Sequence, residues 1–362
     1  MQRLEILDPP NAAQIAKVVA ALRGGQLAIL PTETVYGLAA DSNNPNAVAA
    51  LREIKGHGPD HHFTHHLATA EHTSRLVAPP PPRLESFLHR VWPGPITAVL
   101  PAVTGVGQVG VRVPAHPFTQ AVIAELGNSL YMTSVNTKGK DPINDPELIE
   151  ATFGDEARLS ILAHAGAPRL GEPSAVIRFE GGQLKVLREG ILDGRQILHG
   201  ATAMVTFVCT GNTCRSPMAE ALARHLTAEH LNIPVDQLLA HGLCFVSAGT
   251  STLTGMSAST GSLEVTAELG LDLSGHRTMS VTPELVRESD LVFCLAKSHL
   301  HDVLEVLPEA HDKTFLLGPA QQNVADPVGG AIERYREVRD EIAKHIEARI
   351  PELVGLGFAA SS

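Results

Sequence analysis

The segment from residue 205 to 220 holds the side chains best suited to chemistry on a phosphoryl group. It reads VTFVCTGNTCRSPMAE, so five residues separate Cys209 from Arg215. A thiolate can attack phosphorus, and a guanidinium can hold two phosphoryl oxygens at once. Because a loop of this length can wrap around one phosphate, the spacing predicts a phosphate-binding loop with a thiol nucleophile.

The spacing of Cys209 and Arg215 alone does not indicate a phosphate-binding loop, since Cys and Arg occur at this separation by chance. The secondary structure on either side of the loop provides the further evidence. We expect an apolar strand at 205–208 and a helix at 218–230, with Pro217 in a position favoured in the first turn of a helix. The loop then lies at a helix N-terminus, where free N–H groups and the helix dipole bind anions and favour a thiolate. This context favours the functional interpretation.

The same segment resembles the low-molecular-weight protein tyrosine phosphatase family, whose loop reads V-C-x-G-N-x-C-R-S-P. The resemblance extends over about 204–350 and includes Ser247-Ala248-Gly249 and Asp326-Pro327. It implies that Cys209 forms a thiophosphate intermediate, that Arg215 stabilises the equatorial oxygens, and that Asp326 protonates the leaving group and then activates water.

The resemblance assigns supporting roles to the rest of the loop and implies no metal or other cofactor for the phosphatase. Ser216 is expected to hydrogen-bond the Cys209 thiolate, and Asn212 to hold the loop in shape. Cys214 either pairs reversibly with the nucleophile or is a small packing residue. The predicted phosphate-binding loop consists of Thr210, Gly211, Asn212, Thr213 and Cys214.

Two features bear on the phosphorylated protein substrate. Thr213 and Gly329-Gly330 match the branch of the family that resembles C-T-G-N-T-C-R-S-P and D-P-F-G-G and acts on phosphoarginine. Tyrosine phosphatases usually carry aromatic residues after Asp-Pro, which sandwich the phosphotyrosine ring. Val328 departs from both patterns. We therefore favour phosphoarginine and keep phosphotyrosine as the alternative.

The first half of the chain carries a second set of motifs, including PTETVYG at 31–37 and WPGP at 92–95. In their order they resemble the threonylcarbamoyl-AMP synthase family over about 5–192. The resemblance implies ATP (with Mg), threonine and bicarbonate as ligands, for tRNA modification. It places Thr32, Tyr36 and His66 at the threonine, and Lys55, Ser134, Asn136, Ser174 and Arg188 at the nucleotide.

Three departures from that family favour lost or altered synthase activity. His57 stands where the family keeps an arginine, residues 60–66 are more polar than a buried strand, and Ala175 follows Ser174 where the family has Ser-Thr. Histidines at 57, 61, 62, 65 and 66 leave three interpretations open: a metal site, a remodelled pocket or a polar surface loop.

Three functional hypotheses follow. The chain is a cysteine-dependent phosphatase fused to a degenerate synthase-like domain that binds ATP and threonine. Alternatively, it is bifunctional with an active synthase, or its first half is a non-catalytic ligand- or tRNA-binding module.

Alternating strands and helices predict two α/β domains, at 1–198 and 204–355. The first is expected to be an open twisted sheet, and the second a Rossmann-like parallel sheet. Among the 362 residues, 44% are hydrophobic and 19% charged, as in globular proteins. The net charge is -11, and no segment of the sequence forms a basic stripe, so direct tRNA binding is not expected. The chain shows no signal-peptide pattern and no long apolar run, and a cytoplasmic location without membrane association is expected.

Overall fold

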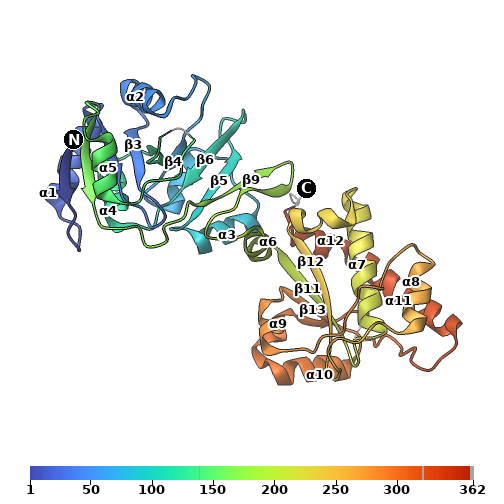
Figure 1. Cartoon of the computed structure of the whole chain (residues 1–362). Helices are drawn as coiled ribbons and strands as arrows, with labels where there is room; N and C mark the ends of the chain where they lie inside the picture. The colour runs from blue at the N-terminus through green and yellow to red at the C-terminus, as the bar shows by residue number, and fades with distance from the viewer. Residues whose placement is uncertain (138, 320–321, 359–362) are drawn as a thin grey trace. The chain divides into compact units, whose positions relative to one another are not determined.

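The chain divides into two compact units, Met1–Gly200 and Ala201–Ser362 (Figure 1). The computed structural model describes residues 1–137, 139–319 and 322–358. The predicted α/β class is confirmed in both units. The segment of chain that joins them is helical, since α6 (Gly194–Ala201) runs through it.

The first unit is built on a ten-stranded mixed sheet of order β1-β8-β2-β3-β7-β4-β6-β5-β9-β10. Its pairings include parallel β1·β8 and antiparallel β2·β3 and β9·β10, the last being a hairpin that turns at Gly181-Gly182. The strands are β1 (Gln2–Glu5), β2 (Leu27–Leu30), β3 (Gly37–Asp41), β4 (Thr64–His66), β5 (Ile96–Pro101), β6 (Gln108–Arg112), β7 (Leu130–Ser134), β8 (Leu159–His164), β9 (Ala175–Glu180) and β10 (Gln183–Arg188).

Alternation along β2 shows how helices cover both faces of this part of the sheet. Leu27 and Ile29 pack in one apolar cluster with residues of α2 and α5, whereas Ala28 and Leu30 pack in another with α1 and α4. Successive side chains point to opposite faces, so a fully apolar strand requires cover on both. The helices are α1 (Ala12–Arg23), α2 (Pro45–Lys55), α3 (Pro82–Val91), α4 (Pro117–Leu126) and α5 (Pro146–Phe153).

The second unit is built on a four-stranded parallel sheet of order β12-β11-β13-β14. The chain passes from β11 (Ala203–Cys209) to β12 (Leu243–Gly249) on one side, and then to β13 (Leu291–Cys294) and β14 (Thr314–Leu316) on the other. The carboxyl end of β11 is therefore a topological switch point, the place where open α/β sheets bind ligands.

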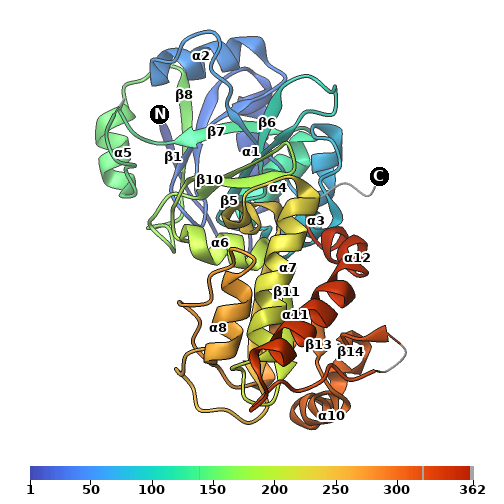
Figure 2. The ribbon, with the colours of Figure 1, turned by 90° about the vertical axis from the view of Figure 1, so that its right-hand side faces the viewer.

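Helices sandwich this second sheet. One face carries α7 (Arg215–Leu231), α11 (Ile332–Glu347) and α12 (Ile350–Gly355), with α8 (Thr260–Ala267) packed against α7 and α11 (Figure 2). The other face carries α9 (Pro283–Glu288) and α10 (Lys297–Val306). The last helical segment of this unit is two helices, because α11 ends at Glu347 and α12 begins at Ile350, one residue before Pro351.

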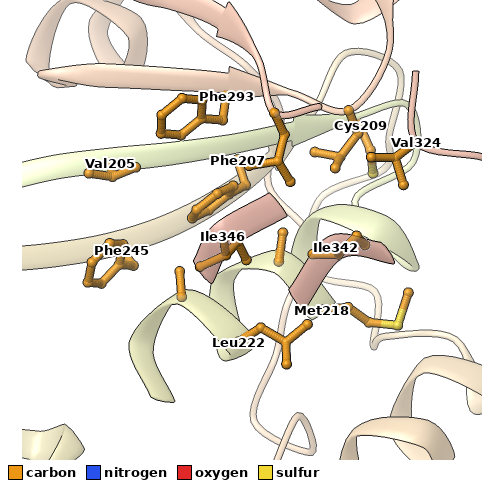
Figure 3. Close-up of a cluster of buried hydrophobic side chains, with 14 of the residues drawn as sticks. Val205, Phe207, Cys209, Met218, Leu222, Phe245, Phe293, Val324, Ile342 and Ile346 are labelled. Carbon is orange, nitrogen blue, oxygen red and sulfur yellow. The ribbon is translucent and has the colours of Figure 1, made fainter. Parts of the chain in front are cut away.

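The core between this sheet and its helices reaches up to the predicted nucleophile. Phe207 lies on β11 and packs in one apolar cluster with Leu222 of α7 and Ile346 of α11, and Cys209 lies at the end of the same strand (Figure 3). All four side chains are almost completely buried. A rigid strand packed on both faces therefore fixes the position of the thiol.

Candidate functional site

The loop between β11 and α7 places the predicted nucleophile at a helix N-terminus. Cys209 ends the strand and Arg215 begins the helix. Asn212 turns the loop between them with a φ of 52°, a left-handed conformation that Asn adopts more readily than most residues. Because the helix begins directly after the loop, its unpaired N–H groups lie at the anion site predicted from the sequence.

The hydroxyl of Ser216 connects the thiol to the loop. Its Oγ lies 3.0 Å from the Sγ of Cys209 and accepts a hydrogen bond of 2.9 Å from the Nδ2 of Asn212. The Ser216 proton has two acceptors in reach, the Cys209 sulfur at 3.0 Å and the carbonyl of Ala248 at 3.3 Å, and the sulfur is the nearer. A donor in this position stabilises a thiolate.

Asn212 is held on every polar atom of its side chain. Its Nδ2 also donates to the Oγ of Ser247 at 3.0 Å, and its Oδ1 accepts from the backbone N–H of Met279 at 2.9 Å. Ser247 in turn donates to Glu220 at 2.7 Å, where burial raises the pKa of the carboxyl. The strained turn is therefore fixed by tertiary contacts.

Arg215 and Asp326 form an ion pair across the mouth of the loop. The Nη2 of Arg215 donates to the Oδ2 of Asp326 at 2.6 Å, and its Nη1 donates to the carbonyl of Val324 at 3.3 Å. The Arg215 side chain is 7% exposed and that of Asp326 is 49% exposed. Within the described residues, the buried Nε of Arg215 has no hydrogen-bond partner. One N–H of the guanidinium is thus unsatisfied at the anion site.

The remaining predicted loop residues surround this centre. The thiol of Cys214 is buried and donates to the Oγ of Ser259 at 3.2 Å, with the hydroxyl of Tyr335 at 3.8 Å. Cys209 and Cys214 are both free thiols. Gly211 and Thr213 lie in the same turn, and the hydroxyl of Thr252 donates to the Gly211 carbonyl at 2.8 Å.

Sequence reasoning missed two neighbours of the loop. His299 on α10 lies 2.9 Å from the Oγ1 of Thr210, and Tyr335 on α11 lies against Cys214. Neither residue belongs to a motif that signals its place. The second serine at the loop, Ser247, does lie in the Ser-Ala-Gly segment that the sequence singled out.

The first unit has a polar cavity of about 390 Å³. Seven of the eight residues predicted to bind substrate or nucleotide line it, three from the strands β4, β7 and β10 and four from segments beside strands: His66, Ser134, Arg188, Thr32, Tyr36, Asn136 and Ser174. The sheet therefore brings together side chains that are as much as 156 residues apart in the chain.

Lys55 is the exception and does not line the cavity. Its ammonium donates to the carbonyls of Ser134 and Asn136 at 3.0 and 3.1 Å and to the Asn136 Oδ1 at 2.5 Å. Burial lowers the pKa of Lys55. An ammonium has three donors, and here all three are used within the protein, so the predicted nucleotide contact of Lys55 is not available in this arrangement.

The structure distributes the clustered histidines over different environments. The rings of His57 and His61 stack with centroids 3.7 Å apart, and neither residue lines the cavity. His66 does line it and is fully enclosed, and burial lowers its pKa to about 3. The short strand β4 begins only at Thr64, so the spacing of four residues within 61–66 does not place two rings on one helical face.

A buried ion pair beside the cavity was not predicted. Arg112 donates to Glu33 at 2.7 Å with both side chains at most 5% exposed, and it also donates to the Thr34 hydroxyl at 2.7 Å. The other carboxylate oxygen of Glu33 accepts from the N–H of Ala115 at 2.8 Å. Both residues lie in segments that carry the family resemblance, PTETVYG and Val111-Arg112-Val113-Pro114, but neither segment indicates that the two side chains pair.

The described residues offer neither a clustered metal site nor a membrane-spanning helix. In the described ranges 1–137, 139–319 and 322–358, no group of three or more His, Cys, Asp or Glu residues could hold a metal ion. Over the same residues, no helix combines the length and the apolar character that crossing a membrane requires.

Comparison with known proteins assigns each unit to a family. A family model of the Sua5, YciO and YrdC proteins, described as telomere recombination, matches residues 20–190. A second model, described as low molecular weight phosphotyrosine protein phosphatase, matches residues 204–354.

Three curated relatives illustrate these matches. The threonylcarbamoyl-AMP synthase of Bacillus subtilis is 31% identical over 52% of this chain and 56% of its own length, so the chain spans about half of that relative. The protein-arginine-phosphatase of Geobacillus stearothermophilus is 37% identical over 40% of this chain and 90% of its own length. The probable low molecular weight protein-tyrosine-phosphatase EpsP of Ralstonia nicotianae is 31% identical over 42% of this chain and 97% of its own length.

Proposed function

Since the chain joins a domain of the Sua5/YrdC family to a domain of the low molecular weight protein phosphatase family, we propose that it is a cysteine-dependent protein phosphatase with a ligand-binding N-terminal unit. The observation that carries the proposal is the cluster of Cys209, Ser216, Arg215 and Asp326 at the carboxyl end of β11. It combines a nucleophile, a donor to that nucleophile, a phosphate clamp and a carboxyl group.

The proposed reaction has two steps. The Cys209 sulfur attacks phosphorus and forms an S–P bond while the bond to the substrate side chain breaks, and Asp326 supplies a proton to the leaving atom. Water then attacks the phosphocysteine, Asp326 accepts its proton, and inorganic phosphate leaves with the thiolate restored. Arg215 and the loop N–H groups hold the equatorial oxygens, and neither step uses a metal or other cofactor.

The ion pair between Arg215 and Asp326 defines how substrate enters. A phosphoryl group that binds the Arg215 guanidinium bidentately must take the place of the Asp326 carboxylate on Nη2 while it satisfies the unpaired Nε. Displacement moves the carboxyl away from the guanidinium and makes it available to the leaving atom. Asp326 can do this because half of its side chain is already exposed.

We favour phosphoarginine over phosphotyrosine as the phosphorylated residue of the protein substrate. The rim after Asp326 carries Val328, which is 67% exposed, followed by Gly329 and Gly330, so it has no ring to stack on a phosphotyrosine. The nearby aromatic residue Tyr335 is buried against Cys214. Steady-state kinetics on matched phosphoarginine and phosphotyrosine peptides test the choice, and a higher kcat/KM for phosphotyrosine would reverse it.

For the N-terminal unit we propose binding of ATP and threonine without efficient threonylcarbamoyl-AMP synthesis. The polar cavity supplies hydroxyls, amides and the cations of Arg188 and Lys140, and its third lining cation, Arg112, is already paired with Glu33. Lys55 is used within the protein and His57 does not line the cavity. Fewer cations then remain to neutralise a triphosphate. ATP with Mg would be a substrate of this unit, and the unit would serve tRNA modification, only under the alternative that the synthase is active.

Pyrophosphate release separates the alternatives for this unit. The full chain is supplied with ATP, Mg²⁺, bicarbonate and threonine, and ATP binding is measured separately by calorimetry. Binding without pyrophosphate supports the proposal, pyrophosphate formation supports a bifunctional enzyme, and absence of ATP binding contradicts both.

A further inference from the structure

Thr210, the residue directly after the nucleophile, is held from two sides. Its carbonyl accepts from the N–H of Ser251 at 2.9 Å and lies so close to Gly249 that a Cβ there would approach it to 2.6 Å. Its side chain is exposed, and its Oγ1 lies 2.9 Å from the Nε2 of His299 on α10. The backbone contact fixes Thr210, and the imidazole fixes its hydroxyl.

The surroundings of His299 decide which atom donates in this contact. The residue is 2% exposed, and its Nδ1 is buried with no hydrogen-bond partner in the described part of the chain. Burial, together with the positive charge of Arg215, lowers the pKa of His299 to about 4, so the ring is neutral at pH 7 and carries one proton. A buried N–H without an acceptor is rarer than an unused lone pair. The proton is therefore on Nε2, which donates to Thr210.

This tautomer controls the direction of the Thr210 hydroxyl. Its oxygen accepts from the imidazole, so its own proton must point elsewhere. Nothing among the described residues accepts that proton. The free donor thus lies beside Cys209, on the exposed side of a loop built to hold an anion.

On the basis of the proposed phosphatase function, we propose that His299 is a positioning residue that turns the Thr210 hydroxyl into a hydrogen-bond donor to the phosphoryl group bound in the loop. His299 does not touch the substrate, whereas Thr210 does. The pair adds a side-chain donor to the backbone donors of the loop. Hydrogen bonds to charged groups are among the stronger ones, so its loss should be visible in both substrate turnover and phosphate binding.

The test compares Thr210→Val, His299→Leu and the double variant in the full chain. The measurements are kcat and KM for p-nitrophenyl phosphate, the inhibition constant of inorganic phosphate, and the melting temperature. Thr210→Ser keeps the hydroxyl, and His299→Gln places an amide N–H near the position of Nε2. The matched control is His301→Leu on the same helix, whose side chain is 74% exposed and forms an exposed pair with Glu305.

We expect each single variant to lose about 10- to 100-fold in kcat/KM and to bind phosphate more weakly. The double variant should lose no more than either single one, Thr210→Ser and His299→Gln should recover most of the loss, and His301→Leu should match the unchanged chain. Losses that multiply in the double variant, or a Thr210→Val variant with full activity, refute the inference while the phosphatase stands. If the unchanged chain releases no phosphate, the proposed function itself fails.

Discussion

Replacing Asp326 by Asn should have opposite effects on phosphate binding and on turnover. The substitution keeps the size of the side chain but removes the charge that pairs with Arg215 at 2.6 Å. Without the competing carboxylate, the guanidinium is available to phosphate from the start. Without the carboxyl, the leaving atom must depart unprotonated.

The exposure of the pair sets the size of the first effect. Fully exposed ion pairs contribute about 0.2–1 kcal/mol, and hydrogen bonds to charged groups about 1.5–3 kcal/mol. Since Arg215 is 7% exposed but Asp326 is 49% exposed, water screens one partner, and about 1 kcal/mol is appropriate. This corresponds to about fivefold tighter phosphate binding. Loss of a general acid costs about 10²–10⁴-fold in rate.

Calorimetry with inorganic phosphate and steady-state kinetics with two aryl phosphates measure both effects. The rate loss should be large for phenyl phosphate and smaller for p-nitrophenyl phosphate, whose leaving group needs less help from an acid. Asp312→Asn is the control, because Asp312 is 87% exposed and forms an exposed pair with the adjacent His311. Weaker phosphate binding in Asp326→Asn, or equal losses on both substrates, would refute the reasoning.

Three further predictions concern single residues in the two units. Cys209→Ser should abolish turnover of p-nitrophenyl phosphate with inorganic phosphate still bound in calorimetry; residual turnover at the original rate would remove the thiophosphate mechanism. Burial lowers the pKa of His66 to about 3, so only the unfolded state takes up a proton as the pH falls below about 6.5, and stability is lost toward pH 3. His66→Gln should therefore reduce the loss of unfolding free energy between pH 7 and 5 by about 2 kcal/mol, measured by urea unfolding with the fluorescence of Trp92, the single tryptophan of the chain; an unchanged pH dependence would contradict this. Glu33→Gln leaves the buried guanidinium of Arg112 without its counter-charge and should lower the unfolding free energy in the same assay by about 3–5 kcal/mol, whereas a loss below 1 kcal/mol would show that the cavity hydrates the guanidinium.

Much of the fold could be predicted because its signals are local. Asn11 and Gly24 bound α1 as cap residues, and the apolar run of β11 predicts a strand covered on both faces. The boundary between the two units was harder to predict, because composition and hydrophobic pattern conflict there. The polar, glycine-containing stretch before residue 203 has a linker composition, yet it folds as α6 with Ile197 completely enclosed.

The site in the N-terminal unit shows where local reasoning stops. Lys55 has the residue type and the motif position of a nucleotide ligand, but its ammonium is used by Ser134 and Asn136, which lie about 80 residues further along the chain. Residue type indicates which chemistry is available, whereas the fold decides whether an atom is free to perform it.

At the phosphate loop, too, some residues could be predicted from the sequence and others only from the tertiary structure. The sequence alone determined Cys209, Asn212, Arg215 and Ser216 as one group, because they lie within a single turn between a strand and a helix, where spacing in the chain is spacing in space. Only the tertiary structure placed Asp326 on Arg215, 111 residues away, and His299 on Thr210, 89 residues away. Such contacts depend on how parallel strands and crossover helices pack, and no local propensity encodes that packing.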